Sequence, residues 1–122
     1  MSSQFTRAQH LAKSRNNENF AAALHTATTA GREWAVTALF YAALHCLQAY
    51  FAARTDRIPI THGHRSSAIQ RDAAISGAYD EYRELSDLSR SARYDCEVIQ
   101  PGHVRFAQEW LASIKAIVAP HL

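Results

Sequence analysis

The sequence is poor in residues that interrupt helices or crosslink a chain, with four glycines, three prolines and two cysteines among 122 residues. No segment alternates apolar and polar residues with the period of two that is typical of strands, and alanine is abundant. Both features favour helix over sheet. Cys46 and Cys96 have neither metal-binding nor redox spacing, and we expect Cys46 to be a small apolar filler on a buried helix.

Signals for export, membrane insertion and several kinds of catalysis are also missing. Residues 1–10 contain no apolar signal core, and we expect no run of about 18 uncharged apolar residues that could span a bilayer. These absences predict a cytoplasmic protein without membrane contact. The sequence has no nucleophile-elbow motif and no phosphate-cradling glycine loop.

The ionisable residues give weak indications of a ligand. The net charge of +2 is too small to imply nucleic-acid binding by itself. His62 and His64 resemble half of a metal site, but no cysteine or carboxylate nearby completes a ligand set. We therefore expect no metal and no cofactor.

Length and periodicity predict one domain, residues 1–122, of the all-α class. Hydrophobic residues make up 48% of the chain and charged residues 20%, which is typical of a globular protein with a core. Apolar residues recur at steps of three and four, as on amphipathic helices. They predict helices over residues 4–30, 32–54, 62–76 and 78–96, and a last one with an apolar stripe over 104–118 that Pro120 ends. Gly31 is expected to end the first helix. The result is an antiparallel bundle of four to five helices.

Residues 34–50 form the most apolar segment, WAVTALFYAALHCLQAY. A helix that is apolar on nearly every face must be buried on all sides, so this segment is predicted to be the central helix. Tyr41 and His45 lie one turn apart on it and are expected to be buried polar groups. The histidine then needs a hydrogen-bond partner, either Tyr41 or a residue of a neighbouring helix.

Large aromatic residues suggest contact with a second copy. Trp34 and Trp110 are expected to anchor the core or an interface. A small domain that displays Phe40, Phe51 or Trp110 outside its own core would need a partner, so a homodimer is predicted.

Four motifs in order resemble the HEPN family of small prokaryotic helical domains. They are the alanine-rich residues 19–24, the tyrosine-alanine-alanine segment 38–50, the helix start Thr61-His62-Gly63-His64-Arg65, and an arginine followed by an aromatic and an acid within residues 85–95. The resemblance covers residues 17–118. It implies an antiparallel bundle that usually dimerises and works on RNA or nucleotides, often in toxin–antitoxin or defence systems. It also allows a nucleotidyltransferase-like protein partner.

Active members of that family are metal-independent ribonucleases, marked by an arginine, four to six residues and a histidine near the start of the final long helix. Here the histidine that follows Arg90 and Arg93 is His103, which is too far along the chain. A literal match, Arg57 to His62, falls between the second and third predicted helices instead. The leading prediction is therefore an RNA- or nucleotide-associated module that is non-catalytic or weakly catalytic.

Two alternatives stay open. One is an endoribonuclease, acting as a dimer, in which Arg57 steadies the phosphate and His62 is the general base, or in which His103 works with Arg90 or Arg93. The other is a pure protein-interaction module.

The candidate site residues form two groups. The first lies around the start of the third helix, where arginine forks and free backbone amides can hold an anion; its members are Arg54, Arg57, His62, His64 and Arg65. The second lies on the fourth helix; its members are Arg83, Arg90, Arg93 and Tyr94. We predict Arg57 and His62 as catalytic residues, and as substrate-binding residues His64, Arg65, Arg90, Arg93 and Tyr94. Solvated loop charges, and ion pairs with Glu84, Asp87 and Asp95, are the structural alternatives.

Overall fold

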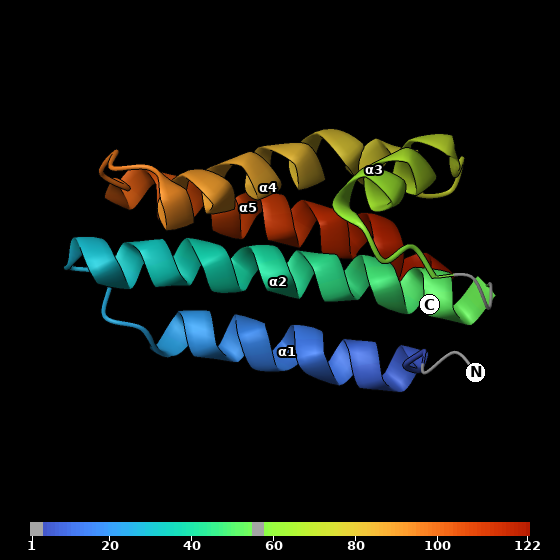
Figure 1. The fold of residues 1–122 in the computed structure, drawn as a ribbon. Coiled ribbons are helices and arrows are strands. Elements are labelled where there is room, and N and C mark those ends of the chain that lie inside the picture. Colours follow the sequence, from blue (N-terminus) through green and yellow to red (C-terminus); the bar gives the residue numbers. More distant parts are fainter. Residues whose placement is uncertain (1–3, 55–57) are drawn as a thin grey trace.

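The chain folds into a bundle in which successive long helices run in opposite directions, with one short helix packed across an end (Figure 1). The computed structural model describes residues 4–54 and 58–122, and within these ranges no residue belongs to a strand. The elements are α1 (Arg7–Ala23), α2 (Thr29–Arg54), α3 (His62–Arg71), the 3-10 turn η1 (Ser76–Ala78), α4 (Tyr79–Tyr94), α5 (Pro101–Val118) and the 3-10 turn η2 (Ala119–His121). The predicted all-α helical bundle is confirmed.

Helix α2 is the centre of the bundle, as its composition predicts. Fourteen of its 26 residues are buried, and it contacts α1, α4 and α5. The predicted stripe of α5 is the buried face of that helix: Val104, Ala107, Leu111, Ile114 and Val118. Each fully buried aliphatic side chain of this kind contributes roughly 1.5–3 kcal/mol.

The expectation that no segment is long and apolar enough to cross a bilayer is wrong. Helix α2 passes that test by length and composition, with a mean hydropathy of 1.4 over 18 residues. However, 78% of that window is buried inside the bundle. Because the other helices enclose it, its apolarity is explained by its place in the protein core.

The first helix ends earlier than predicted, and the reason lies in Thr28. Helix α1 stops at Ala23, and Asn16 and Asn17 lie within it without interrupting it. The Thr28 hydroxyl accepts a hydrogen bond from the Gly31 backbone amide at 3.0 Å, as an N-terminal cap does. Residues 28–31, predicted as a stop signal, therefore begin α2.

The other predicted helix ends differ by a few residues. The expected N-cap Thr61 does begin α3, but this helix stops at Arg71 because Asp72 turns the chain. The Asp72 carboxylate accepts hydrogen bonds from the Ala74 amide at 3.0 Å and from the Tyr50 hydroxyl at 2.8 Å. Pro101 occupies the first turn of α5, where its missing N–H costs nothing.

The aromatic residues offered as reasons for a dimer are not exposed. Phe40 and Phe51 are buried in the chain's own core, and Trp110 packs partly buried against it. Trp34 is instead 59% exposed. The homodimer therefore stays a prediction, without support from Phe40 and Phe51.

Gly31 gives a test of the α1–α2 connection. A Cβ at this position would lie closer to the His25 carbonyl oxygen than real Cβ atoms approach. We expect Gly31→Ala to destabilise the protein by about 1–3 kcal/mol, as overpacking does, measured by urea unfolding. Gly63→Ala is the control: its Cβ meets open space, and alanine is favoured in a helix by up to about 1 kcal/mol. Equal effects of the two substitutions would contradict the close approach.

Candidate functional site

The start of α3 places two of the predicted site residues, His62 and Arg65. Pro59 prevents helix before this point, and its carbonyl accepts a hydrogen bond from Gln48 Nε2 at 2.6 Å, which attaches the segment to α2. The Thr61 hydroxyl then caps α3 by accepting from the His64 amide at 3.1 Å. One turn later, Arg65 is only 7% exposed.

The guanidinium of Arg65 is buried with weak partners. Its Nη1 donates to the Tyr82 hydroxyl and its Nη2 to the Ile60 carbonyl, both at 3.4 Å. These distances exceed the roughly 2.7–3.2 Å of strong N–H···O bonds. Its buried Nε has no partner among the described residues. Because arginine stays charged, α3 presents a cation whose hydrogen-bonding capacity is largely unused.

His62 lies where the two predicted groups of site residues meet. Its ring is stacked near Tyr82, with centroids 6.4 Å apart and planes at 24°. Burial lowers the pKa of His62, and the charges of Arg90 and Arg65 lower it further, while Asp87 acts in the opposite direction. At neutral pH the structure therefore holds a neutral imidazole beside two guanidinium groups.

Arg93 lies among aromatic rings. Its guanidinium carbon is 5.9 Å from the ring centre of Phe40, 5.8 Å from that of Tyr41 and 5.5 Å from that of Tyr94. Its Nη1 donates to the Tyr41 hydroxyl at 3.4 Å, and its buried Nε has no partner among the described residues. Cation–π contacts of this kind hold the charge in place without neutralising it.

An aromatic pocket adjoins Arg93. A cavity of about 310 Å³ is lined by Glu33, Trp34, Thr37, Ala92 and Arg93. The side chain of Trp34 is exposed here, and Tyr94 is 74% exposed at the end of α4. The cavity thus offers an open aromatic ring beside a guanidinium.

Contacts link α3 to α4 at Tyr82, and α4 to α2 at Arg93. Arg90 and Arg93 are three residues apart on α4, and Asp87 is three residues before Arg90, so the three follow one side of the helix over roughly 9 Å. We call the surface formed by His62, Arg65, Arg90, Arg93, Tyr94, Tyr41 and Trp34 the basic–aromatic face. Two groups of residues that are separate in the sequence therefore meet within one chain.

Ion pairing does not neutralise the face. Of the described residues, the salt bridges are Arg83 to Glu84 at 3.4 Å and Lys115 to Glu18 at 2.8 Å. The predicted pairing with local carboxylates thus occurs at Arg83 but not at Arg90 or Arg93. Among the described residues, Arg90 and Arg93 therefore have no carboxylate partner, and Arg93 lies among the aromatic rings.

The remaining predicted residues lie elsewhere or serve the fold. Arg57 falls outside the described residues. The guanidinium of Arg54 lies 4.2 Å above the ring of Tyr50, at the C-terminal end of α2. His64 is exposed on the first turn of α3. His103 Nδ1 accepts a hydrogen bond from the Gln100 amide at 2.9 Å, so it caps the start of α5.

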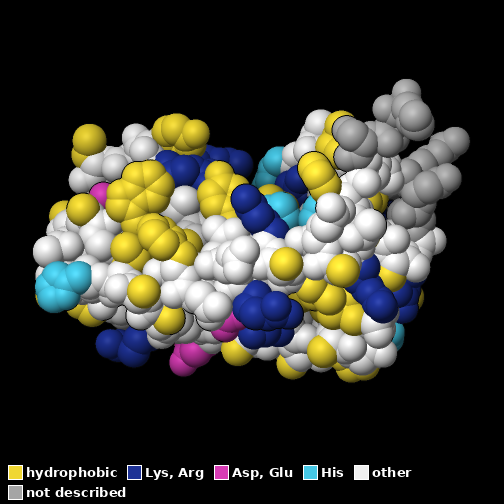
Figure 2. Space-filling view, turned by 90° about the horizontal axis from the view of Figure 1, so that it is seen from below, with side chains coloured by type: hydrophobic (Ala, Val, Ile, Leu, Met, Phe, Trp, Pro, Cys, Tyr) yellow, Lys and Arg dark blue, Asp and Glu magenta, His cyan; other side chains and the backbone are white. Residues whose placement is uncertain are grey.

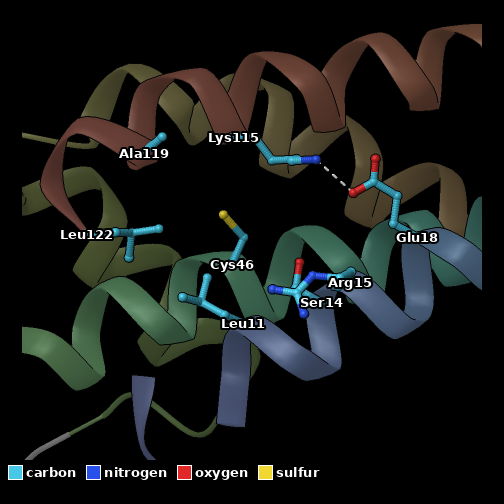
Figure 3. A pocket seen from close by; sticks show the side chains of 8 residues that line it. All are labelled: Leu11, Ser14, Arg15, Glu18, Cys46, Lys115, Ala119 and Leu122. Atoms are coloured by element: carbon cyan, nitrogen blue, oxygen red, sulfur yellow. Dashed lines mark hydrogen bonds and ion pairs between the residues drawn. The ribbon is translucent and has the colours of Figure 1, made fainter. Parts of the chain in front are cut away.

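A second pocket, between α1, α2 and α5, contains no reactive group (Figure 3). The sulfur of Cys46 points into this cavity of about 180 Å³. Burial raises the pKa of the Cys46 thiol to about 11, so it stays protonated and unreactive, in line with a filler. Lys115, which also lines the cavity, is held by Glu18. Across the described ranges, no three His, Cys, Asp or Glu side chains are grouped as a metal site.

Sequence reasoning missed three features of this part of the molecule. Trp34 belongs to the exposed face and not to the core. Tyr41, expected to be buried, is 38% exposed and accepts from Arg93, whereas the partner of His45 is His10 of α1, which fits the predicted alternative of a neighbouring helix. The position of Arg93 over α2 depends on how α4 packs, and no motif carries that information.

The charges around His62 can be tested individually. Arg90→Gln removes a positive charge that opposes protonation, so we expect the pKa of His62 to rise; Asp87→Asn should lower it further. The imidazole resonances followed by NMR across a pH series give both directions. Arg83→Gln, on the same helix but paired with Glu84, serves as control. The same shift in all three variants would show that His62 does not contact this side of α4.

Comparison with known proteins adds no relative. No family model matches the chain, and no curated protein and no solved structure matches it either. The likeness to HEPN domains therefore depends on the motifs and on the helical bundle alone.

Proposed function

We propose that the chain is a HEPN-like module that binds single-stranded RNA on the basic–aromatic face, with weak or no catalysis. The observation that supports this most directly is Arg93, a guanidinium among three aromatic rings at the edge of the exposed Trp34. Proteins that bind single strands combine stacking platforms with cations that follow the phosphate backbone. Both parts occur here side by side.

The exposed rings are the stacking platforms of this proposal. Trp34 opens into a cavity of about 310 Å³, and Tyr94 stands free at the end of α4. A base that stacks on either ring removes apolar surface from water and places its phosphate near Arg93. Bases of an unpaired strand can do this because they are not already stacked in a duplex.

The cations supply the backbone contacts. Arg90 and Arg93 have no carboxylate within salt-bridge distance among the described residues, and Arg65 has only long hydrogen bonds. A phosphate would replace water and weak partners with charge-assisted hydrogen bonds. Asp87 on the same helix limits how many phosphates the face can hold.

The biological setting in this proposal comes from the resemblance. In this setting the chain is a cytoplasmic protein of a toxin–antitoxin or defence system. It forms a homodimer and has a nucleotidyltransferase-like protein as a further partner. A pure protein-interaction module is the competing function, because an exposed tryptophan is also a common anchor of protein interfaces.

Substitutions on the face should weaken RNA binding. We expect Trp34→Ala to lower the affinity for a short single-stranded RNA roughly 5- to 100-fold, from the ~1–3 kcal/mol of a stacked base. Arg93→Gln should reduce the slope of log affinity against log salt by about one. Fluorescence anisotropy over a salt series measures both.

Matched controls lie on α5, which contributes nothing to the face. Phe106→Ala removes another exposed ring and Arg105→Gln another exposed cation, and neither should change RNA binding. Equal losses in these variants would mean that binding is unspecific. No RNA binding even at low salt would favour the protein-interaction module.

A second candidate, metal-independent RNA cleavage, is favoured by one observation. His62 is held neutral beside Arg65 and Arg90, and a neutral imidazole can take the proton of a ribose 2′-hydroxyl while arginines stabilise the phosphate. The partner first predicted for it, Arg57, lies outside the described residues, so Arg90 and Arg65 take that role in this candidate.

Cleavage in the presence of EDTA tests this second function. Loss of a general base should slow the reaction by roughly 10²- to 10⁴-fold in His62→Ala. His25→Ala, an exposed histidine in the α1–α2 connection, is the control and should keep the wild-type rate. Identical background cleavage by wild type and His62→Ala would eliminate catalysis by this histidine.

A further inference from the structure

A pair of histidines joins α1 to α2 beside the basic–aromatic face. His10 Nδ1 and His45 Nδ1 are 3.1 Å apart, and the two rings are stacked with centroids at 5.3 Å and planes at 27°. His10 is only 8% exposed. Such a contact is a hydrogen bond only when one Nδ1 carries a hydrogen and the other does not. When both Nδ1 atoms carry a hydrogen, each needs an acceptor other than its neighbour.

The pair lines a cavity whose other polar groups are donors. The cavity measures about 220 Å³, and its walls are Phe5, Gln9, His10, Lys13 and His45. The Gln9 side-chain oxygen already accepts from the Thr6 amide at 2.8 Å, so its NH₂ group is the part left to bond a ligand. The Lys13 ammonium is a donor only. A ligand with several acceptor oxygens fits this set.

The charged groups around the pair have one sign. Those that act on His45 are the cations Lys13 of α1 and Arg65 of α3, together with His10 of α1, which is positive only when it is protonated. Arg65, which belongs to the basic–aromatic face, also acts on His62, so the histidine pair and this face share one nearby cation. Figure 2 shows histidine side chains within a hollow of this side of the molecule, with Lys or Arg side chains near it.

We propose that this cavity binds a phosphate group, and that binding is coupled to the uptake of a proton by the His10–His45 pair. The added proton makes both imidazoles donors towards the phosphate oxygens. Lys13 and the Gln9 amide complete the set. The cavity is large enough for one phosphate group and leaves room for part of the group attached to it.

The electrostatics give the coupling its direction. In the empty cavity, burial lowers the pKa of both histidines, to about 4 for His45, and the neighbouring cations add to this for His45. A bound anion opposes the effect of the cations, favours the protonated imidazole and so raises both pKa values. Because the bound anion raises the pKa of the histidines, the protonated pair binds the anion more tightly than the neutral pair does. The affinity for the anion therefore rises as the pH falls, by up to about tenfold per pH unit for one proton.

The source of the phosphate depends on the proposed function. If RNA occupies the basic–aromatic face, its backbone supplies the phosphate group, because Arg65 of that face also acts on His45 of the pair. A free oxyanion is the other source, and the cavity itself does not require RNA.

The test uses dimethyl phosphate, a diester whose charge stays constant between pH 5 and 8. We expect it to shift the NMR imidazole signals of His10 and His45, and its affinity to rise at least fivefold from pH 7 to pH 5.5. Lys13→Gln, an exposed position that should leave the fold intact, should weaken binding severalfold, and His45→Asn should abolish its pH dependence. His25→Gln is the control and should behave as wild type. Sulfate, a dianion over the whole range, tests the free-oxyanion source.

Several results would overturn the proposal: an affinity independent of pH, binding unchanged in Lys13→Gln and His45→Asn, or histidine signals that respond to Zn²⁺ but not to either oxyanion. Its failure is separable from that of the RNA proposal. Dimethyl phosphate binding that persists in Trp34→Ala, together with no RNA binding, rejects only the proposed function. RNA binding that depends on Trp34 but not on Lys13 or pH rejects only the phosphate cavity.

Discussion

The enclosure of α2 is the constraint on which the rest of the structure depends. Its side chains are apolar on almost every face, and the free energy of removing them from water is gained only if α1, α4 and α5 surround it. Those three helices are themselves polar on their outer sides and have little reason to associate without it. The connections, caps and helix ends then adjust to that packing, as the Thr28 cap at the start of α2 shows.

The enclosure is incomplete along one strip of α2, and both candidate sites lie on it. Trp34, Tyr41 and His45 follow each other at steps of seven and four, which places them on one side of a helix. Two of them are met by a polar group from a neighbour: Tyr41 by Arg93 of α4 and His45 by His10 of α1. This partly covered strip is thus where aromatic and titratable groups come within reach of a ligand.

The charge of this region has a physical consequence. Arg65, Arg90, Arg93 and Lys13 lie around it, whereas the salt bridges of the described residues involve Arg83 and Lys115. Burial lowers the pKa of His62 and of His45, and the neighbouring cations lower both further. A protein with a net charge of only +2 therefore concentrates positive potential at one place. Phosphate-bearing ligands are the class that such a potential attracts.

The sequence alone determined the helical class, the central position of residues 34–50 and the buried stripe of α5. Each of these follows from the spacing of apolar residues along the chain. It also indicated His62, Arg65, Arg90 and Arg93 as candidates through residue type. Only the tertiary structure decided that these residues share a face, that Trp34 is exposed and that His10 meets His45. The contacts behind these relations join residues far apart in the chain, such as His10 and His45, or Tyr41 and Arg93, which are 52 positions apart. They depend on the angle and register at which helices pack, and these arise from the side-chain contacts of the whole core, which no local pattern encodes.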